Sequence, residues 1–136
     1  MNPDTLSIAA KGLNTVIALL VLPFGLIQRH RPRVHIPVML TAFVADVGNV
    51  LLVEYVARLG HGKGAVEEGL DAFTGGGTSL QRFHIIVSVA SILGYAVAAI
   101  TGSRLYRRGA GRNVHRANAV VFVFARYASY ITSFWM

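Results

Sequence analysis

The chain has 136 residues, of which 54% are hydrophobic and 14% are charged. A soluble domain carries about 25% charged residues, and a soluble fold of this length could not bury so much apolar surface, so we expect a membrane protein. The net charge of +7 comes from short basic clusters between apolar runs, which favours a role in membrane orientation over binding to nucleic acid. The absence of cysteine excludes disulfide bonds and thiolate metal sites.

Four apolar runs are long enough to cross a hydrocarbon core of about 30 Å, which takes about 20 helical residues. In chain order they cover residues 6–27, 36–56, 83–102 and 117–135, and residues 57–82 form a flexible, glycine-rich loop. Because the other connections are short, we predict an all-α, up-down-up-down four-helix bundle in the membrane, as a single domain over residues 1–136.

The charges of the connections predict the direction of the helices. Residues 28–34 contain three arginines and residues 103–116 contain five, and neither segment contains an acid. In residues 57–82, by contrast, three basic residues are balanced by three acidic ones. By the positive-inside rule, the arginine-rich connections lie in the cytoplasm. Both termini and the 57–82 loop are then expected outside the cell.

Opposite charges inside the second and fourth runs predict a buried ion pair. Asp46 lies eleven residues after His35, and Arg126 lies eleven residues after His115. Eleven residues make three helical turns plus about 20°, so each charge shares a helix face with the preceding histidine. Because both helices run outward from the cytoplasmic side, we expect Asp46 and Arg126 to pair near the middle of the membrane. Such a pair could also serve only to fix helix register.

Other polar residues extend this predicted network. Asn49 follows Asp46 on the same stripe, and Tyr95 lies eleven residues after His84, so its hydroxyl should reach the same depth. The face of the third run that carries His84 also holds small residues suited to close helix contact, namely Ser88, Ser91, Ala98 and Gly102. A second ion pair, between Lys11 and Glu54, is expected nearer the outer surface.

Four of the five histidines lie at the ends of predicted spans: an inner pair, His35 and His115, and an outer pair, His61 and His84. Facing neutral imidazoles bind haem iron axially or coordinate a metal ion. The inner pair has no acid nearby, which favours haem b. The outer pair has Glu67 and Glu68 nearby, and these four residues predict a copper or zinc site. The alternative is that all four are interfacial histidines without a ligand.

The order of these features resembles the small four-span membrane proteins of the domain-of-unknown-function-420 family, over nearly the whole chain. The features are Leu13–Asn14, His35–Ile36–Pro37–Val38–Met39–Leu40, Tyr55 six residues before His61, His84, and His115–Arg116. The resemblance implies that the four histidines are the family's histidines. It also implies a multi-pass protein of a prokaryotic plasma membrane, associated with the maturation of haem–copper terminal oxidases.

We therefore expect a haem- or metal-binding membrane protein that supports assembly of a respiratory oxidase. Its expected partners are the lipid bilayer, oxidase subunits or haem and copper delivery proteins, and a second copy of the chain. One alternative is a compact bis-histidine b-type cytochrome that transfers electrons across the membrane or from quinol. Another is a structural subunit without a cofactor. No G-x-S-x-G or H-E-x-x-H motif is present, so nothing favours a hydrolytic enzyme.

Overall fold

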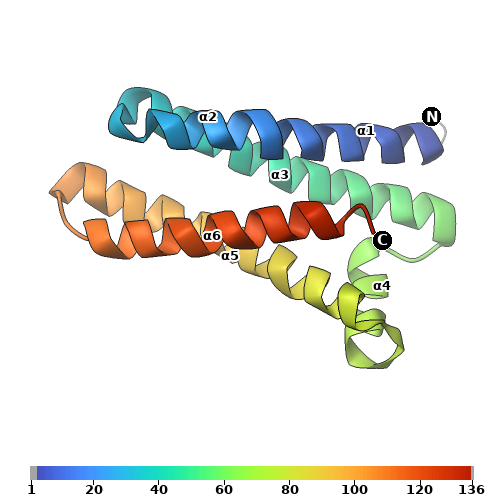
Figure 1. Cartoon of the computed structure of the whole chain (residues 1–136). Helices are drawn as coiled ribbons and strands as arrows, with labels where there is room; N and C mark the ends of the chain where they lie inside the picture. The colour runs from blue at the N-terminus through green and yellow to red at the C-terminus, as the bar shows by residue number, and fades with distance from the viewer. Residues whose placement is uncertain (1–2, 136) are drawn as a thin grey trace. The chain divides into compact units, whose positions relative to one another are not determined.

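The computed structural model describes the backbone of residues 3–135 and the side chains of residues 5–60 and 62–135. Nearly all of these residues are helical and none of them lies in a strand (Figure 1). The all-α prediction is confirmed. The chain divides into two compact units, Met1–Thr78 and Ser79–Met136. The predicted single domain stays a prediction, and each unit is described by itself.

The first unit begins with a continuous helical rod that changes geometry near Pro23. The rod comprises α1 (Pro3–Val16), a π-helical turn η1 (Ile17–Val21), α2 (Leu22–Ile27) and a 3₁₀ turn η2 (Gln28–His30). Pro23 has no amide hydrogen, and its ring crowds the carbonyl one turn earlier, at Leu19. The wider π-helical turn contains Leu19 and therefore accommodates the proline without ending the rod.

Helix α3 (Pro32–His61) runs back along α1 and α2 (Figure 1). It begins at a proline, whose missing amide hydrogen costs nothing in a first turn. It ends at Gly62, which adopts the left-handed backbone conformation (φ 73°). Gly25 lets α2 and α3 approach closely, since a Cβ atom there would lie 2.8 Å from the Sδ atom of Met39.

The segment predicted as a flexible loop over residues 57–82 is largely helical. Residues 57–61 complete α3, and α4 (Ala65–Asp71) and a π-helical turn η3 (Ala72–Gly76) follow. Glu54 on α3 stabilises α4, because its Oε2 atom accepts a hydrogen bond from the Val66 amide at 2.9 Å. The glycines of this segment favour irregular structure locally, but the hydrogen bond between Glu54 and Val66 stabilises a helix instead.

The predicted ion pair between Lys11 and Glu54 is wrong. The Glu54 carboxylate pairs instead with Arg58, whose Nη2 atom lies 2.8 Å from Oε1. Arg58 is one turn further along the same helix, so it reaches Glu54 with little loss of conformational freedom. Lys63, two residues before α4, and Asp71, at the end of α4, form a second ion pair at 3.0 Å.

The second unit is a hairpin of α5 (Ser79–Arg108) and α6 (Arg112–Thr132), which lie side by side (Figure 1). The predicted small-residue face of the third run packs against α6, which confirms that prediction. The Ser88 and Ser129 hydroxyl oxygens are 2.8 Å apart, and the rings of Tyr95 and Phe122 have centroids 4.3 Å apart. A Cβ atom added at Gly94 would lie 3.0 Å from the Phe122 Cβ, so the glycine permits this approach.

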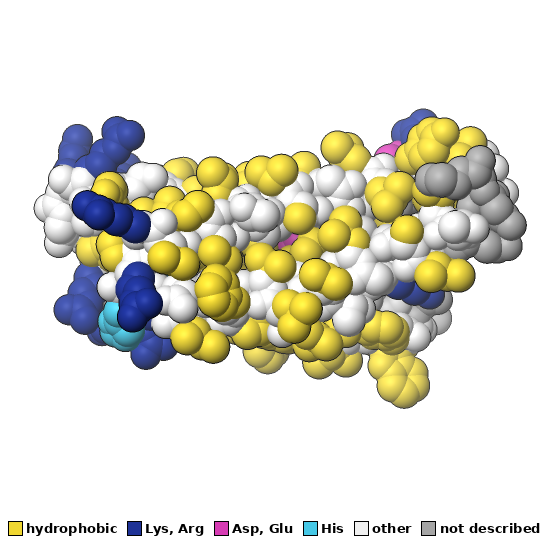
Figure 2. All heavy atoms as spheres, turned by 90° about the horizontal axis from the view of Figure 1, so that it is seen from above, with side chains coloured by type: hydrophobic (Ala, Val, Ile, Leu, Met, Phe, Trp, Pro, Cys, Tyr) yellow, Lys and Arg dark blue, Asp and Glu magenta, His cyan; other side chains and the backbone are white. Residues whose placement is uncertain are grey.

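Within the described residues, three helical segments are long and apolar enough to cross a membrane: Thr5–His30, Pro32–Gly60 and Ser79–Arg108. They contain the first three predicted spans. Hydrophobic side chains cover much of the molecular surface in Figure 2, as expected for helices that face lipid. Helix α6, which corresponds to the fourth predicted span, is not among the three, since its first turns contain Arg112, Arg116 and two asparagines.

Candidate ligand-binding histidines

The ring of His35 is oriented by the backbone of α2. Its Nδ1 atom lies 2.7 Å from the carbonyl oxygen of Gly25. A carbonyl oxygen can only accept a hydrogen bond, so Nδ1 carries the proton and donates it. In the neutral ring the lone pair then resides on Nε2. The side chain of His35 is half-buried.

The ring of His115 on α6 is oriented by a threonine of α5. Its Nδ1 atom lies 3.0 Å from Oγ1 of Thr101. The hydroxyl of Thr101 donates its only hydrogen to the Val97 carbonyl at 2.7 Å, so it accepts from Nδ1 and the lone pair of the neutral ring lies on Nε2. Gly102 makes room for the ring, because a Cβ atom there would lie 3.2 Å from the His115 Cε1.

The same arrangement recurs at His84, near the opposite end of the hairpin. The Nδ1 atom of His84 lies 2.7 Å from Oγ1 of Thr132, and that hydroxyl donates to the carbonyl of Ala128 at 2.7 Å. Nδ1 therefore again donates, and Nε2 carries the lone pair. The hydroxyl oxygen of Ser88 lies 3.4 Å from this Nε2 and 2.8 Å from the Ser129 hydroxyl, so the lone pair points into a small polar cluster.

Three histidines from two units thus share one tautomer. Each ring donates from Nδ1 to an oxygen of the protein and carries its lone pair on Nε2. Histidines that bind metal or haem iron are usually held in this way, because the outer hydrogen bond fixes the tautomer and the orientation of the ring and raises its basicity. The arrangement suits the Nε2 atoms for binding a Lewis-acidic ligand.

The predicted outer metal site combines residues of both units, with His84 in the second and the other three in the first. The residues that the structure describes include no group of three or more histidine, aspartate or glutamate side chains that could hold a metal ion. Glu67 and Glu68 lie in the first turn of α4, where carboxylates favour the helix dipole. The side chain of His61 lies outside the described residues. The four-residue copper or zinc site stays a prediction.

The residues of the predicted polar network are largely shielded. Arg126 and Tyr95 are each 5% exposed, and Asp46 and Asn49 are half-buried. The Oδ1 atom of Asn49 is buried without a hydrogen-bond partner among the described residues. Because Asp46 and Arg126 belong to different units, their pairing stays a prediction. So do the pairs His35–His115 and His61–His84.

Sequence reasoning missed Thr101 and Thr132, which orient two of the three rings. Both threonines donate a hydrogen bond to a carbonyl of their own helix. Threonine often does so within helices, so the sequence alone does not distinguish these two threonines from others. A comparison with protein-family models, curated proteins and solved structures finds no match to this chain.

Proposed function

We propose that this protein binds haem b, or a copper or zinc ion, through the Nε2 atoms of His35, His84 and His115. The observation that carries the proposal is the tautomer that these rings share. Each Nδ1 donates to a protein oxygen at 2.7–3.0 Å, which is the outer hydrogen bond typical of ligand histidines. When bound, haem would supply a redox-active iron, and copper or zinc would supply a Lewis acid.

In the proposed arrangement, α6 is a fourth span, and the four helices form an up-down-up-down bundle with both termini outside. The arginine-rich connections support this orientation. The inner ligand would then be held by His35 and His115, and the outer one by His61 and His84 with Glu67 and Glu68. The proposed location is a prokaryotic plasma membrane.

The proposed biological role is to carry haem or metal during the maturation of a terminal oxidase. It rests on the resemblance to the domain-of-unknown-function-420 family, carried by the histidine motifs of the sequence. The proposed partners are oxidase subunits and proteins that deliver haem or copper. The bis-histidine cytochrome differs from this role only in whether the bound iron exchanges electrons with quinol.

An absorption spectrum of the detergent-purified protein, before and after reduction, tests ligand binding. We expect a Soret band that is lost in His35→Ala and His115→Ala, or copper or zinc in the metal analysis that is lost in His84→Ala. His30→Ala is the matched control, since within the described residues the His30 ring makes one hydrogen bond, which it accepts from the neighbouring Arg29 at 3.2 Å. If the wild-type protein neither carries nor takes up haem, copper or zinc, the proposal is wrong. A structural subunit without a cofactor would then be favoured.

A further inference from the structure

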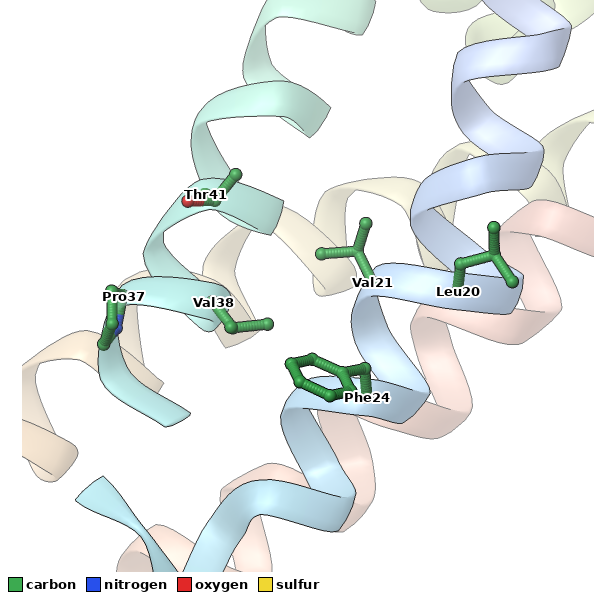
Figure 3. Close-up of a pocket in the computed structure, with 6 residues that line it drawn as sticks. All are labelled: Leu20, Val21, Phe24, Pro37, Val38 and Thr41. Atoms are coloured by element: carbon green, nitrogen blue, oxygen red, sulfur yellow. The ribbon is translucent and has the colours of Figure 1, made fainter. Parts of the chain in front are cut away.

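The hairpin of α2 and α3 contains an apolar groove of about 370 Å³ (Figure 3). Its lining residues are Leu20, Val21, Phe24, Pro37, Val38 and Thr41. Phe24 and Val38 point toward one another from the two helices (Figure 3). All six residues lie within the two membrane-crossing segments of this unit. In the hydrocarbon region, the occupant of an open apolar groove must itself be apolar.

The groove lies where both helices depart from regular geometry. Leu20 and Val21 belong to the π-helical turn η1, and Pro37 interrupts the hydrogen-bond ladder near the start of α3. A π-helical turn widens the helix locally and is frequent at functional sites. Three of the six lining residues therefore belong to these irregular positions.

A cationic residue precedes the groove by one turn on α3. Arg33 lies four residues before Pro37 and eight before Thr41, so it shares a helix face with Pro37 and lies about 80° around the axis from Thr41. At 1.5 Å per residue, Arg33 is about 6 Å above Pro37 and about 12 Å above Thr41 along the axis. A phosphodiester at Arg33 would thus place the first carbons of its acyl chains at the groove.

The charge of Arg33 is not neutralised within the described part of the chain. Arg33 is exposed, and its side chain makes no hydrogen bond or ion pair with the described residues. Arg29 and Arg31, in the connection just before α3, add positive charge close to Arg33 in the sequence. Residues 28–34 contain no acid. Clusters of this kind next to a membrane helix attract anionic lipid headgroups.

We propose that the α2–α3 hairpin binds one anionic phospholipid, with the phosphate at Arg33 and one acyl chain in the groove. The proposal is independent of haem or metal binding, because it uses none of the candidate ligand histidines. It joins two observations in one unit, an apolar groove that opens within the membrane and an uncompensated arginine one turn before Pro37 on α3.

Photo-crosslinking in phosphatidylcholine vesicles tests the proposal. The probe is a trace of phosphatidylglycerol with a diazirine in one acyl chain, compared with phosphatidylcholine that carries the same chain. We expect phosphatidylglycerol to label residues 20–24 and 37–41 in excess over phosphatidylcholine. Because one basic residue at the membrane surface changes lipid affinity about fivefold, Arg33→Gln should reduce this excess about fivefold.

Two further variants separate the headgroup from the acyl chain. Arg107→Gln is the matched control, because Arg107 is also exposed at a helix end but belongs to the α5–α6 hairpin; it should leave the labelling unchanged. Thr41→Trp should fill the groove and abolish labelling at residues 20–24 while the helical circular dichroism persists. Equal labelling by both lipids, an unchanged excess in Arg33→Gln, or crosslinks between two copies through the groove would overturn the proposal.

Discussion

The Nδ1 atom of His84 donates a hydrogen bond to Oγ1 of Thr132 over 2.7 Å, although 48 residues separate them in the chain. The threonine hydroxyl is already committed as a donor to its own helix, at the carbonyl of Ala128. It therefore acts as an acceptor only, and this decides the tautomer of the ring. His115 and Thr101 repeat the arrangement with the roles of the two helices exchanged.

Replacing Thr132 with valine should remove the hydrogen bond that orients the ring of His84. Valine has nearly the same shape but offers no acceptor to Nδ1–H, so the ring loses its fixed tautomer and orientation. We expect haem or metal affinity at His84 to fall about 10- to 100-fold. Independently of any ligand, ¹⁵N NMR of labelled histidine should show a mixture of tautomers at His84. Thr132→Ser keeps the hydroxyl and should behave like the wild type; an identical ¹⁵N spectrum for Thr132→Val would contradict the assignment.

Gly94→Ala should destabilise the α5–α6 hairpin. The new Cβ would lie 3.0 Å from the Cβ of Phe122, in a helix contact that cannot widen without losing the neighbouring Tyr95–Phe122 contact. Overpacking of this kind costs about 1–3 kcal/mol. Thermal unfolding in detergent measures the loss, with Gly48→Ala as control because its Cβ would meet no atom within 4 Å. Equal melting temperatures for the two variants would contradict the packing argument.

Glu54→Ala should loosen α4 from α3. The substitution removes the acceptor of the Val66 amide and the ion-pair partner of Arg58. We expect the amide of Val66 to exchange with deuterium faster than in the wild type, while amides in the α5–α6 hairpin keep their rates. Glu67→Ala is the comparison, since the exposed side chain of Glu67 makes no hydrogen bond or ion pair with the described residues. Unchanged exchange at Val66 in Glu54→Ala would show that the contact does not hold α4.

The ion pair of Lys63 and Asp71 predicts a pH effect outside the membrane. The hydrogen bond that the Lys63 ammonium donates to the Asp71 carboxylate, followed by the negative charge of Asp71, raises the pKa of Lys63 above its ordinary value of 10.5. A raised pKa means that the pair contributes fully below pH 10.5 and is lost as the pH rises through the higher folded-state value. Asp71→Asn should therefore lower the pKa of Lys63 in an NMR titration of ¹³C-labelled lysine. An unchanged titration of Lys63 would contradict the pair.

The sequence-based pairing of Asp46 with Arg126 is testable by a double-mutant cycle. Arg126 is 5% exposed, and removing one partner of a buried ion pair costs about 3–5 kcal/mol. We expect Asp46→Ala to destabilise the protein more than Asp46→Ala combined with Arg126→Met, as measured by unfolding in mixed micelles. If the single and double variants lose the same stability, the two residues do not pair.

The candidate site was predictable from the sequence only in part. The positions of His35, His84 and His115 at the ends of apolar runs follow from the order of residues alone. Their tautomers do not, because the decisive acceptors are a carbonyl on α2 for His35 and the hydroxyls of Thr101 and Thr132 for the other two. The groove near Arg33 likewise is lined by Leu20 and Val21 of the π-helical turn, a local geometry that hydrophobic periodicity does not predict.

The sequence by itself determined that this protein is helical and apolar enough to cross a membrane, because length and hydropathy add up residue by residue. It also determined which face of the third run is suited to pack, because helix periodicity fixes which residues share a face. The tertiary structure alone decided that residues 65–76 are helical and which atom of each ring carries the lone pair. Those outcomes depend on hydrogen bonds between residues 10 to 48 positions apart, which no local pattern encodes.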